Sequence, residues 1–223
     1  MKKLISPFAQ IKIAVDLFSK KENFIFLVKI YLPLIFFPIL SIAFAYLPFF
    51  ANNSTAVWFL WLAGVVRALD LVVGLFVTIA AIMAIAKVVD GKKIEVNKVF
   101  KNAWKIYWKF LLFSVVAGLI FLLGFALLII PGIILLVWFT FSRFILIEKG
   151  MSIKESLLKS KAMVRGLFWK VLWRVIVFGL FSLFIEIILS AIPFGIGSVI
   201  STLIGALIIL PTYLLYRELS VAR

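Results

Sequence analysis

The chain of 223 residues contains no cysteine and no histidine, and only nine of its residues are acidic. Without cysteine it can form neither a disulfide nor a thiolate metal site. Without histidine it lacks the usual general base and the usual zinc ligand. The few acidic residues are scattered along the chain, so we expect no catalytic site, no metal site and no cofactor. The sequence predicts a protein that is not an enzyme.

Apolar side chains, by contrast, dominate the composition. Hydrophobic residues make up 65% of the chain, and its mean hydropathy is +1.24. A soluble domain is about half apolar. Several apolar stretches reach or exceed the roughly 20 residues that cross a 30 Å hydrocarbon core. We therefore predict an all-α integral membrane protein, with a single polytopic membrane domain over residues 1–223.

Six transmembrane helices in three hairpins are predicted from the apolar stretches and from the polar or Pro-Gly breaks between them. The predicted spans are 24–50, 56–89, 111–130, 133–148, 171–192 and 196–216. The second span would be about 50 Å long at 1.5 Å per residue, so we expect it to be tilted or broken. Amphipathic segments precede each hairpin and are predicted to be helices on the cytoplasmic membrane surface. These segments are 6–18, 91–109 and 152–167.

The basic residues give the predicted orientation. The three proposed outer turns, at 51–55, 130–133 and 192–196, contain no Lys or Arg. Of the 24 basic residues, all except Arg67 lie in the termini, in the two basic loops or near the inner helix ends. Basic residues are enriched on the cytoplasmic side of membrane proteins. We therefore expect a multi-pass protein of the cell (inner) membrane with both termini in the cytoplasm.

The net charge of +15 follows from this topology, so nucleic acid is not an expected partner. Anionic membrane lipids are expected partners, and a membrane protein or a second copy of the chain is a further possibility. Two basic stripes are candidates for contact with anionic lipid. They consist of Lys98, Lys101, Lys105 and Lys109 in the first loop and Lys154, Lys161 and Arg165 in the second. The alternative is that these residues only fix the topology.

Three charged residues stand inside the apolar stretches. Arg67 and Asp70 are three residues apart and share a helix face, and Glu186 lies in the outer half of the fifth span. A charge at mid-bilayer costs roughly 2.5–3.5 kcal/mol, so such residues usually pair or line a polar path. We expect the three to form one buried ionic cluster, either a clamp between spans or a solute or proton site; separate snorkelling is the third alternative. Glu148 is expected to form a structural tie with Arg143 or with the next helix.

The second and third parts of the chain echo each other. Three pairs of motifs recur at an offset of 59 to 62 residues. The pairs are Gly91-x-x-Ile94 with Gly150-x-x-Ile153, Tyr107-Trp108-Lys109 with Phe168-Trp169-Lys170, and Ile130-Pro131 with Ile192-Pro193. The pattern predicts a repeated unit of one amphipathic helix followed by one membrane hairpin, with all copies in the same orientation. Ser152 and Glu155 also form a predicted capping box at the start of the second amphipathic helix.

Residues 128–170, about a fifth of the chain, resemble the membrane domain of some bacterial glycerophosphoryl diester phosphodiesterases and its stand-alone relatives. The residues that carry the resemblance are Ile130-Pro131-Gly132, Glu148, Gly150, Ser156-Leu157, Ser160 and Gly166-x-Phe168-Trp169. The resemblance implies an all-helical membrane module. The phosphodiesterase activity of that family belongs to a separate soluble domain, which these 223 residues do not contain.

Together these features predict a non-catalytic multi-pass membrane module that interacts with anionic lipid or with a membrane partner. The alternative is a small-solute or lipid transporter or channel that uses Arg67, Asp70 and Glu186.

Overall fold

The computed structural model describes residues 4–46, 53–92 and 95–221. Within these ranges the chain is helical and contains no strand. The elements are α1 (Pro7–Ser19), α2 (Lys21–Tyr46), α3 (Asn53–Val89), α4 (Val96–Leu127), α5 (Ile129–Phe139), α6 (Ser142–Lys149), α7 (Ile153–Val164), α8 (Phe168–Ser190), the short 3-10 helix η2 (Pro193–Gly195), α9 (Ile196–Leu203) and α10 (Gly205–Val221). Six helical segments of the described chain are long and apolar enough to cross a membrane. The predicted all-α fold with six spans is confirmed.

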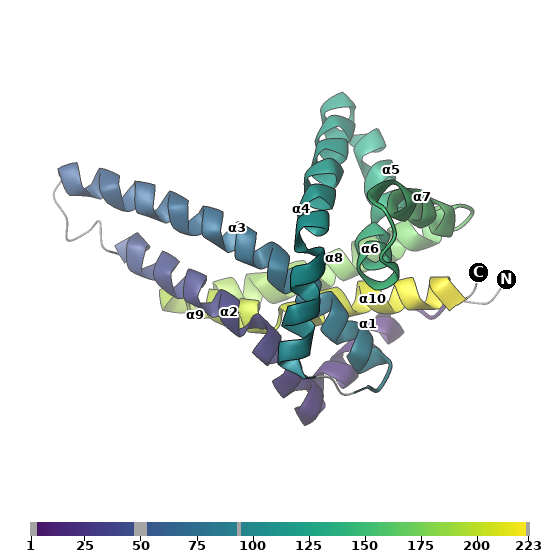
Figure 1. Cartoon of the computed structure of the whole chain (residues 1–223), viewed down its shortest axis with the longest axis horizontal. Coiled ribbons are helices and arrows are strands. Elements are labelled where there is room, and N and C mark those ends of the chain that lie inside the picture. Colours follow the sequence, from purple (N-terminus) through teal and green to yellow (C-terminus); the bar gives the residue numbers. More distant parts are fainter. Residues whose placement is uncertain (1–3, 47–52, 93–94, 222–223) are drawn as a thin grey trace.

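The spans pack as three hairpins that share one base. α2 packs on α3, α4 on α5, and α8 on α9. The hairpin of α4 and α5 rises steeply away from the other two, so its tip lies far from α9 (Figure 1). α1, α6, α7 and the end of α10 gather at the base, where both chain termini lie (Figure 1).

One boundary differs from the prediction because a helix continues. The segments 91–109 and 111–130, predicted as separate elements, belong to the single helix α4. In the second copy of the repeat the chain does break, between α7 and α8, where Gly166 has a φ of +80°. At an offset of 61 residues its counterpart is Lys105, a good helix former. Gly91 and Gly150 both have positive φ, at +66° and +64°. The two helices that precede the amphipathic segments therefore end in the same way.

The turn between the third and fourth spans lies at Leu128 and not at Pro131-Gly132. Leu128 has extended backbone, and Pro131 is the third residue of α5. The first four N–H groups of a helix have no intrahelical acceptor, so proline is tolerated there. Gly132 permits close packing of the hairpin, because a Cβ at this residue would lie 2.5 Å from the Phe125 ring.

The first two predicted spans also shift at their outer ends. Residues 53–55 of the predicted turn at 51–55 belong to α3, and 47–52 lie outside the described residues. The second span is one unbroken helix of 37 residues, which removes the alternative of a broken span. The first span begins at Lys21 and stays helical through Pro33 and Pro38.

A break inside the fourth span is held together by α7. α5 ends at Phe139 and α6 begins at Ser142. The buried hydroxyl of Ser160 donates a hydrogen bond to the Trp138 carbonyl, at 2.6 Å, and accepts one from the Phe141 N–H, at 3.2 Å. Backbone groups that the break frees thus find partners, as buried polar groups require. The predicted capping box is present, and it starts α7 one turn before Ser156.

α1 is docked on the protein as well as exposed at its surface. The Ser6 hydroxyl oxygen caps the helix by accepting a hydrogen bond from the Ala9 N–H. Ala14 and Phe18 are buried, whereas Phe8 is 69% exposed. Glu218 of α10 accepts hydrogen bonds from the Ile5 N–H and the Gln10 side chain, at 2.7 and 2.8 Å. The first helix is thereby fixed to the last.

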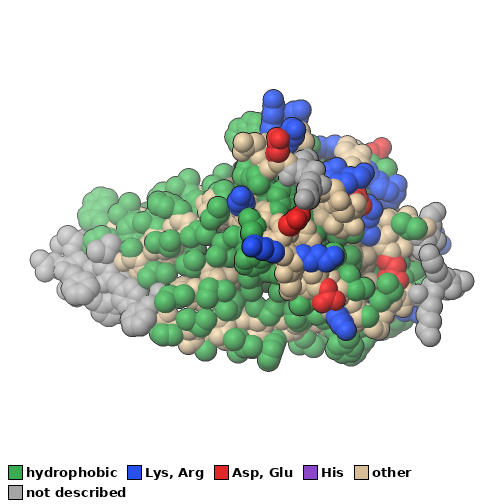
Figure 2. Space-filling model, turned by 90° about the horizontal axis from the view of Figure 1, so that it is seen from below, with side chains coloured by type: hydrophobic (Ala, Val, Ile, Leu, Met, Phe, Trp, Pro, Cys, Tyr) green, Lys and Arg blue, Asp and Glu red, His purple; other side chains and the backbone are tan. Residues whose placement is uncertain are grey.

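The surface divides into an apolar part and a charged end. Figure 2 shows hydrophobic side chains over the part of the face that is distant from the termini, while Lys, Arg, Asp and Glu gather toward the termini. Exposed tryptophans lie toward both ends of the spans, with Trp58 and Trp61 near the start of α3 and Trp104 and Trp108 in the first half of α4. This distribution is typical of a protein whose apolar band is covered by lipid and bordered by aromatic belts.

Candidate intramembrane site

The three charged residues singled out in the spans meet at one hollow of about 770 Å³. We call it the α3–α9 hollow. α2, α3, α4, α8, α9 and the start of α10 form its walls. Its polar lining consists of Arg67, Asp70, Thr78, Ser114, Glu186, Ser198, Ser201 and Thr202, together with Tyr31. The volume lies in the range of small-molecule sites, about 300–1,000 Å³.

The three charges share the hollow without forming the expected buried ionic cluster. Within the described chain no ion pair joins them, and the side chains of Arg67 and Glu186 are exposed to the hollow or beyond it. Glu186 instead accepts a hydrogen bond from the Ser201 hydroxyl at 2.5 Å. The depth of a residue along its span is readable from the sequence, but its distance across the bundle is not. The hollow separates α3 from the Glu186–Ser201 pair.

Most hydroxyl groups of this hollow can only accept hydrogen bonds from a ligand, because their own protons are already donated to the backbone. Thr78, Ser114, Ser198 and Thr202 each donate their proton to a backbone carbonyl three or four residues earlier, at 2.6 to 2.9 Å. Their free lone pairs, with the Asp70 and Glu186 carboxylates, favour a ligand that donates hydrogen bonds or carries positive charge. Arg67 is the cation of the lining. The arrangement fits a ligand that carries both charges.

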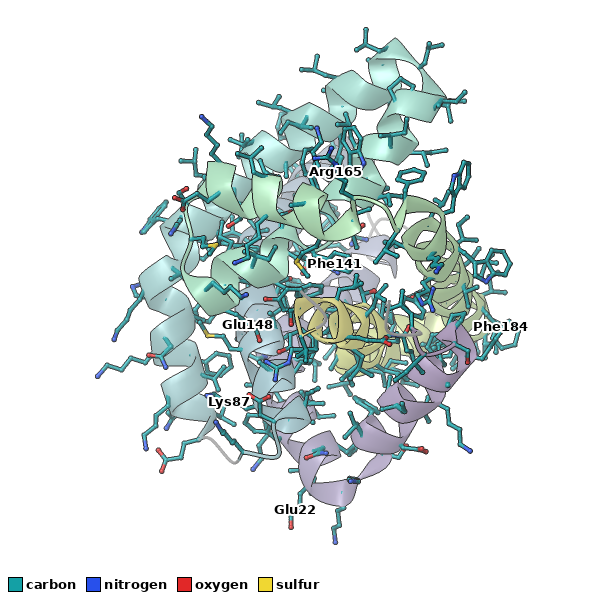
Figure 3. All side chains as sticks on the ribbon, turned by 90° about the vertical axis from the view of Figure 1, so that its right-hand side faces the viewer. Glu22, Lys87, Phe141, Glu148, Arg165 and Phe184 are labelled. Carbon is teal, nitrogen blue, oxygen red and sulfur yellow. The ribbon has the colours of Figure 1, made fainter. Side chains whose placement is uncertain are left out.

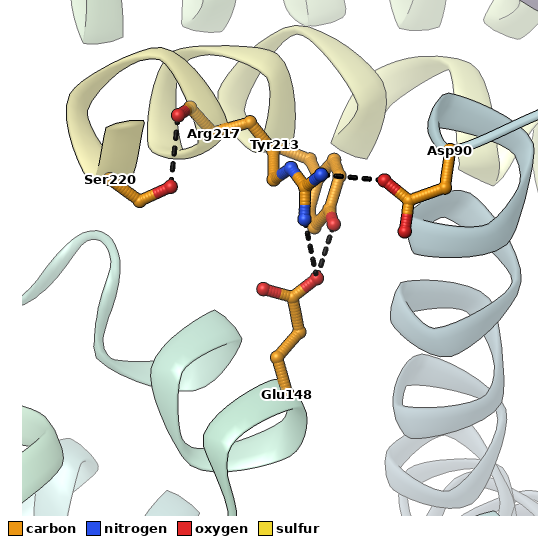
Figure 4. A network of polar contacts seen from close by, with 5 residues as sticks. All are labelled: Asp90, Glu148, Tyr213, Arg217 and Ser220. Carbon is orange, nitrogen blue, oxygen red and sulfur yellow. Dashed lines mark hydrogen bonds and ion pairs between the residues drawn. The ribbon is translucent and has the colours of Figure 1, made fainter. Parts of the chain in front are cut away.

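A polar network at the charged end joins three distant parts of the chain. Arg217 of α10 donates to the Asp90 carboxylate, at 2.5 Å, just after the end of α3. Its other terminal nitrogen lies 3.9 Å from Glu148 of α6. Glu148 also accepts a hydrogen bond from the Tyr213 hydroxyl (Figure 4). Seen from this end, Glu148 lies near the centre of the molecule, next to α10 (Figure 3).

Sequence reasoning missed this network, which we call the base network. The sequence predicted that Glu148 contacts Arg143 or the next helix. Its partners are instead Tyr213 and Arg217 of α10. Tyr213 and Arg217 are four residues apart and so share a helix face. That spacing is the one available signal, and it does not identify a partner 65 residues away.

The two basic stripes are engaged to different degrees. Lys98 lies 3.4 Å from Glu95, Lys109 donates to the Gly150 carbonyl at 2.7 Å, and the Lys161 ammonium lies 4.1 Å from the centre of the Trp138 ring. Arg165 also has an interaction partner. The remaining stripe residues are exposed and make no ion pair with a described residue. They are Lys101, Lys105 and Lys154.

The fold and the composition of its surface define the class of this protein. The chain is an all-α, multi-pass membrane protein. Comparison with protein-family models, with curated proteins and with solved structures gave no match. The resemblance of residues 128–170 to the phosphodiesterase-associated membrane domain therefore stays a prediction.

Proposed function

We propose that this protein is a non-catalytic membrane protein that binds anionic lipid at its charged end, chiefly through α4. The observation that carries the proposal is the exposed pair Lys101 and Lys105, flanked by the exposed rings of Trp104 and Trp108. At positions i, i+3, i+4 and i+7 these four residues occupy one face of α4. Tryptophan favours the level of the head groups, and lysine reaches anionic phosphates from there.

The charge balance supports the same proposal. The chain has 24 basic and nine acidic residues, so its own acidic residues leave a net positive charge of 15 (24 minus 9) that they do not neutralise. Near an anionic membrane surface each exposed Lys or Arg contributes about 1 kcal/mol. Lys101 and Lys105 together would then change the affinity for an anionic surface about 30-fold, because 1.4 kcal/mol corresponds to a factor of ten.

The test is retention of anionic lipid by the purified protein. Wild type and the double variant Lys101→Gln/Lys105→Gln are exchanged into neutral detergent with equal amounts of phosphatidylglycerol and phosphatidylcholine, and the bound lipid is measured by native mass spectrometry. We expect the double variant to lose its preference for phosphatidylglycerol. The control is Lys12→Gln/Lys20→Gln, which removes two positive charges from exposed positions outside α4 and should leave the preference unchanged. An unchanged preference in the double variant would exclude the proposal.

The α3–α9 hollow favours a second candidate function, the binding and passage of a zwitterionic solute or lipid head group. Its lining combines Arg67 with Asp70 and Glu186, which suits an anionic and a cationic group on one ligand. The probe is dihexanoyl phosphatidylethanolamine, with dihexanoyl phosphatidylglycerol as the anionic comparison. Binding of the first that is weakened by Asp70→Asn and by Glu186→Gln, and not by Lys101→Gln/Lys105→Gln, supports this candidate. Equal binding by all variants excludes it.

A further inference from the structure

A second hollow of about 410 Å³ lies next to the first, along the same face of α10. We call it the α4–α8 hollow, because α4 and α8 form its walls together with α5, α6 and α10. Ile208 borders both this hollow and the α3–α9 hollow. Aromatic and aliphatic side chains make up most of the lining, among them Phe113, Phe121, Phe139 and Phe178. A long apolar chain is the kind of ligand that such walls accommodate.

Arg143 is the single charged residue that lines this hollow. Its Nε atom is fully buried without a hydrogen-bond partner. In the described chain Arg143 forms no ion pair, and its guanidinium group lies 4.8 Å from the centre of the Phe144 ring. Phe144 packs edge-on against Tyr213, with ring centres 5.5 Å apart. Arg143 precedes Phe144 in the sequence and Thr212 precedes Tyr213, so this ring contact brings Arg143 and Thr212 to the same hollow.

Another arginine of the spans shows how this protein satisfies such a group for a structural purpose. Arg174 of α8 is buried, and its two terminal nitrogens donate to the Lys170 and Ile5 carbonyls at 2.9 and 2.7 Å. The buried Nε atoms of both arginines lack a partner, but in the described chain the terminal nitrogens of Arg143 make no hydrogen bond or ion pair like those of Arg174. A desolvated cation without an anion is costly, so an anionic ligand at Arg143 would relieve a cost that the fold alone leaves in place.

The hydroxyl groups of the hollow restrict the kind of anion. Thr140, Ser142 and Ser182 donate their protons to backbone carbonyls at 2.6 to 2.9 Å and so offer acceptors. The donors that remain are the Arg143 guanidinium group and the Thr212 hydroxyl. A compact, singly charged group with two oxygens matches a guanidinium fork and one hydroxyl. A carboxylate has this form.

We propose that the α4–α8 hollow binds a long-chain carboxylic acid, with the carboxylate at Arg143 and the alkyl chain along the apolar walls of α4 and α8. This binding lies inside the bundle, apart from Lys101 and Lys105, and does not rest on the lipid binding proposed for α4. It gives the protein a ligand that is distinct from the bilayer phospholipids.

The test is photolabelling with palmitate that carries a diazirine in its chain. The purified protein is placed in phosphatidylcholine nanodiscs, and labelled residues are located by peptide mass spectrometry. We expect labels on α4 and α8 within the hollow, competed by palmitate and not by hexadecanol, which lacks the charge. Because a hydrogen bond to a charged group contributes roughly 1.5–3 kcal/mol, Arg143→Gln should reduce the labelling about tenfold or more.

A second variant blocks the hollow and leaves Arg143 in place. A Cβ at Gly179, which lines the hollow, would meet no atom within 4 Å. Gly179→Leu can therefore enter the open space, and we expect it to reduce the labelling as well. The matched control is Gly118→Leu, because Gly118 is equally uncrowded but does not line the hollow. The lysine variant Lys101→Gln/Lys105→Gln should label like wild type.

The outcomes separate this proposal from the first. Loss of labelling in Arg143→Gln and Gly179→Leu, with normal labelling in the two controls, supports a carboxylate site in the hollow. Full labelling in Arg143→Gln, or competition by hexadecanol equal to that by palmitate, overturns it. Loss of labelling in the lysine variant alone also overturns it and places the palmitate at the membrane surface.

Discussion

The base network offers a sharp test of how the three hairpins are held together. Arg217 contacts Asp90 after α3 and Glu148 on α6, while belonging to α10 itself. In Arg217→Gln the two carboxylates face each other without their shared cation. We predict a clear loss of thermal stability, because each hairpin loses a polar link to another at the base.

The size of the loss follows from exposure. A hydrogen bond to a charged group contributes roughly 1.5–3 kcal/mol when buried, but the side chains of Arg217 and Asp90 are 37% and 27% exposed. Exposed ion pairs contribute about 1 kcal/mol or less. We therefore expect a loss of about 1–2 kcal/mol. For a domain of this size each kcal/mol lowers the Tm by about 2–4 °C, so the expected change is about 2–8 °C.

The assay is thermal unfolding in neutral detergent, followed by tryptophan fluorescence. Asp90→Asn and the double variant complete a thermodynamic cycle, in which we expect a coupling free energy of about 1 kcal/mol. Lys105→Gln, at an exposed position without an ion pair among the described residues, is the control for loss of charge. If Arg217→Gln costs no more stability than Lys105→Gln, the network does not stabilise the base.

Three further predictions concern packing, pH and topology. A Cβ at Gly197 would lie 1.8 Å from the Leu189 carbonyl oxygen, so Gly197→Ala should destabilise the protein by about 1–3 kcal/mol. Gly64 is uncrowded within its helix, so Gly64→Ala should be neutral or stabilising by up to about 1 kcal/mol. Thermal unfolding compares the two variants. Hydrogen bonds from the backbone and side chain of Ser152 lower the pKa of Glu155. The stability that this adds is complete above the ordinary glutamate pKa and is lost as the pH falls through the lowered value. Glu155→Gln removes the charge that these hydrogen bonds stabilise, so the Tm difference between wild type and Glu155→Gln should shrink below about pH 4. The chain has no cysteine, so an impermeant maleimide should label Leu128→Cys from outside intact cells and Lys101→Cys only in inverted vesicles; labelling of both from one side would contradict the predicted topology.

Features that depend on local composition were predictable from the sequence. The number of spans follows from apolar length, and the capping box of Ser152 and Glu155 follows from a four-residue pattern. The predicted turn at Pro131-Gly132 lies three residues after the observed turn at Leu128, because Pro and Gly mark a turn only approximately. Pro131 is compatible with the first turn of α5 as well as with a loop.

Features that depend on distant residues were not predictable. The break after Phe139 has no local helix breaker, and its backbone groups are satisfied by Ser160, about 20 residues later. The partner of Glu148 lies on the last helix. Arg67, Asp70 and Glu186 were expected to come together as one cluster, and they do line one hollow. Their separation across it depends on how the helices splay, which one chain's periodicity does not encode.

α10 is the element through which these features are related. Gly205 and Ile208 face the α3–α9 hollow, Ile208 and Thr212 face the α4–α8 hollow, and Tyr213 and Arg217 belong to the base network. Residues at i, i+3 and i+7 share one helix face, so the two hollows lie side by side along α10, and each has its own arginine. A ligand held at Arg67 and a ligand held at Arg143 would therefore contact neighbouring parts of the same face of α10. Because the lining of the α3–α9 hollow includes the carboxylates of Asp70 and Glu186 and that of the α4–α8 hollow includes none, the two sites differ in the charge that they accept.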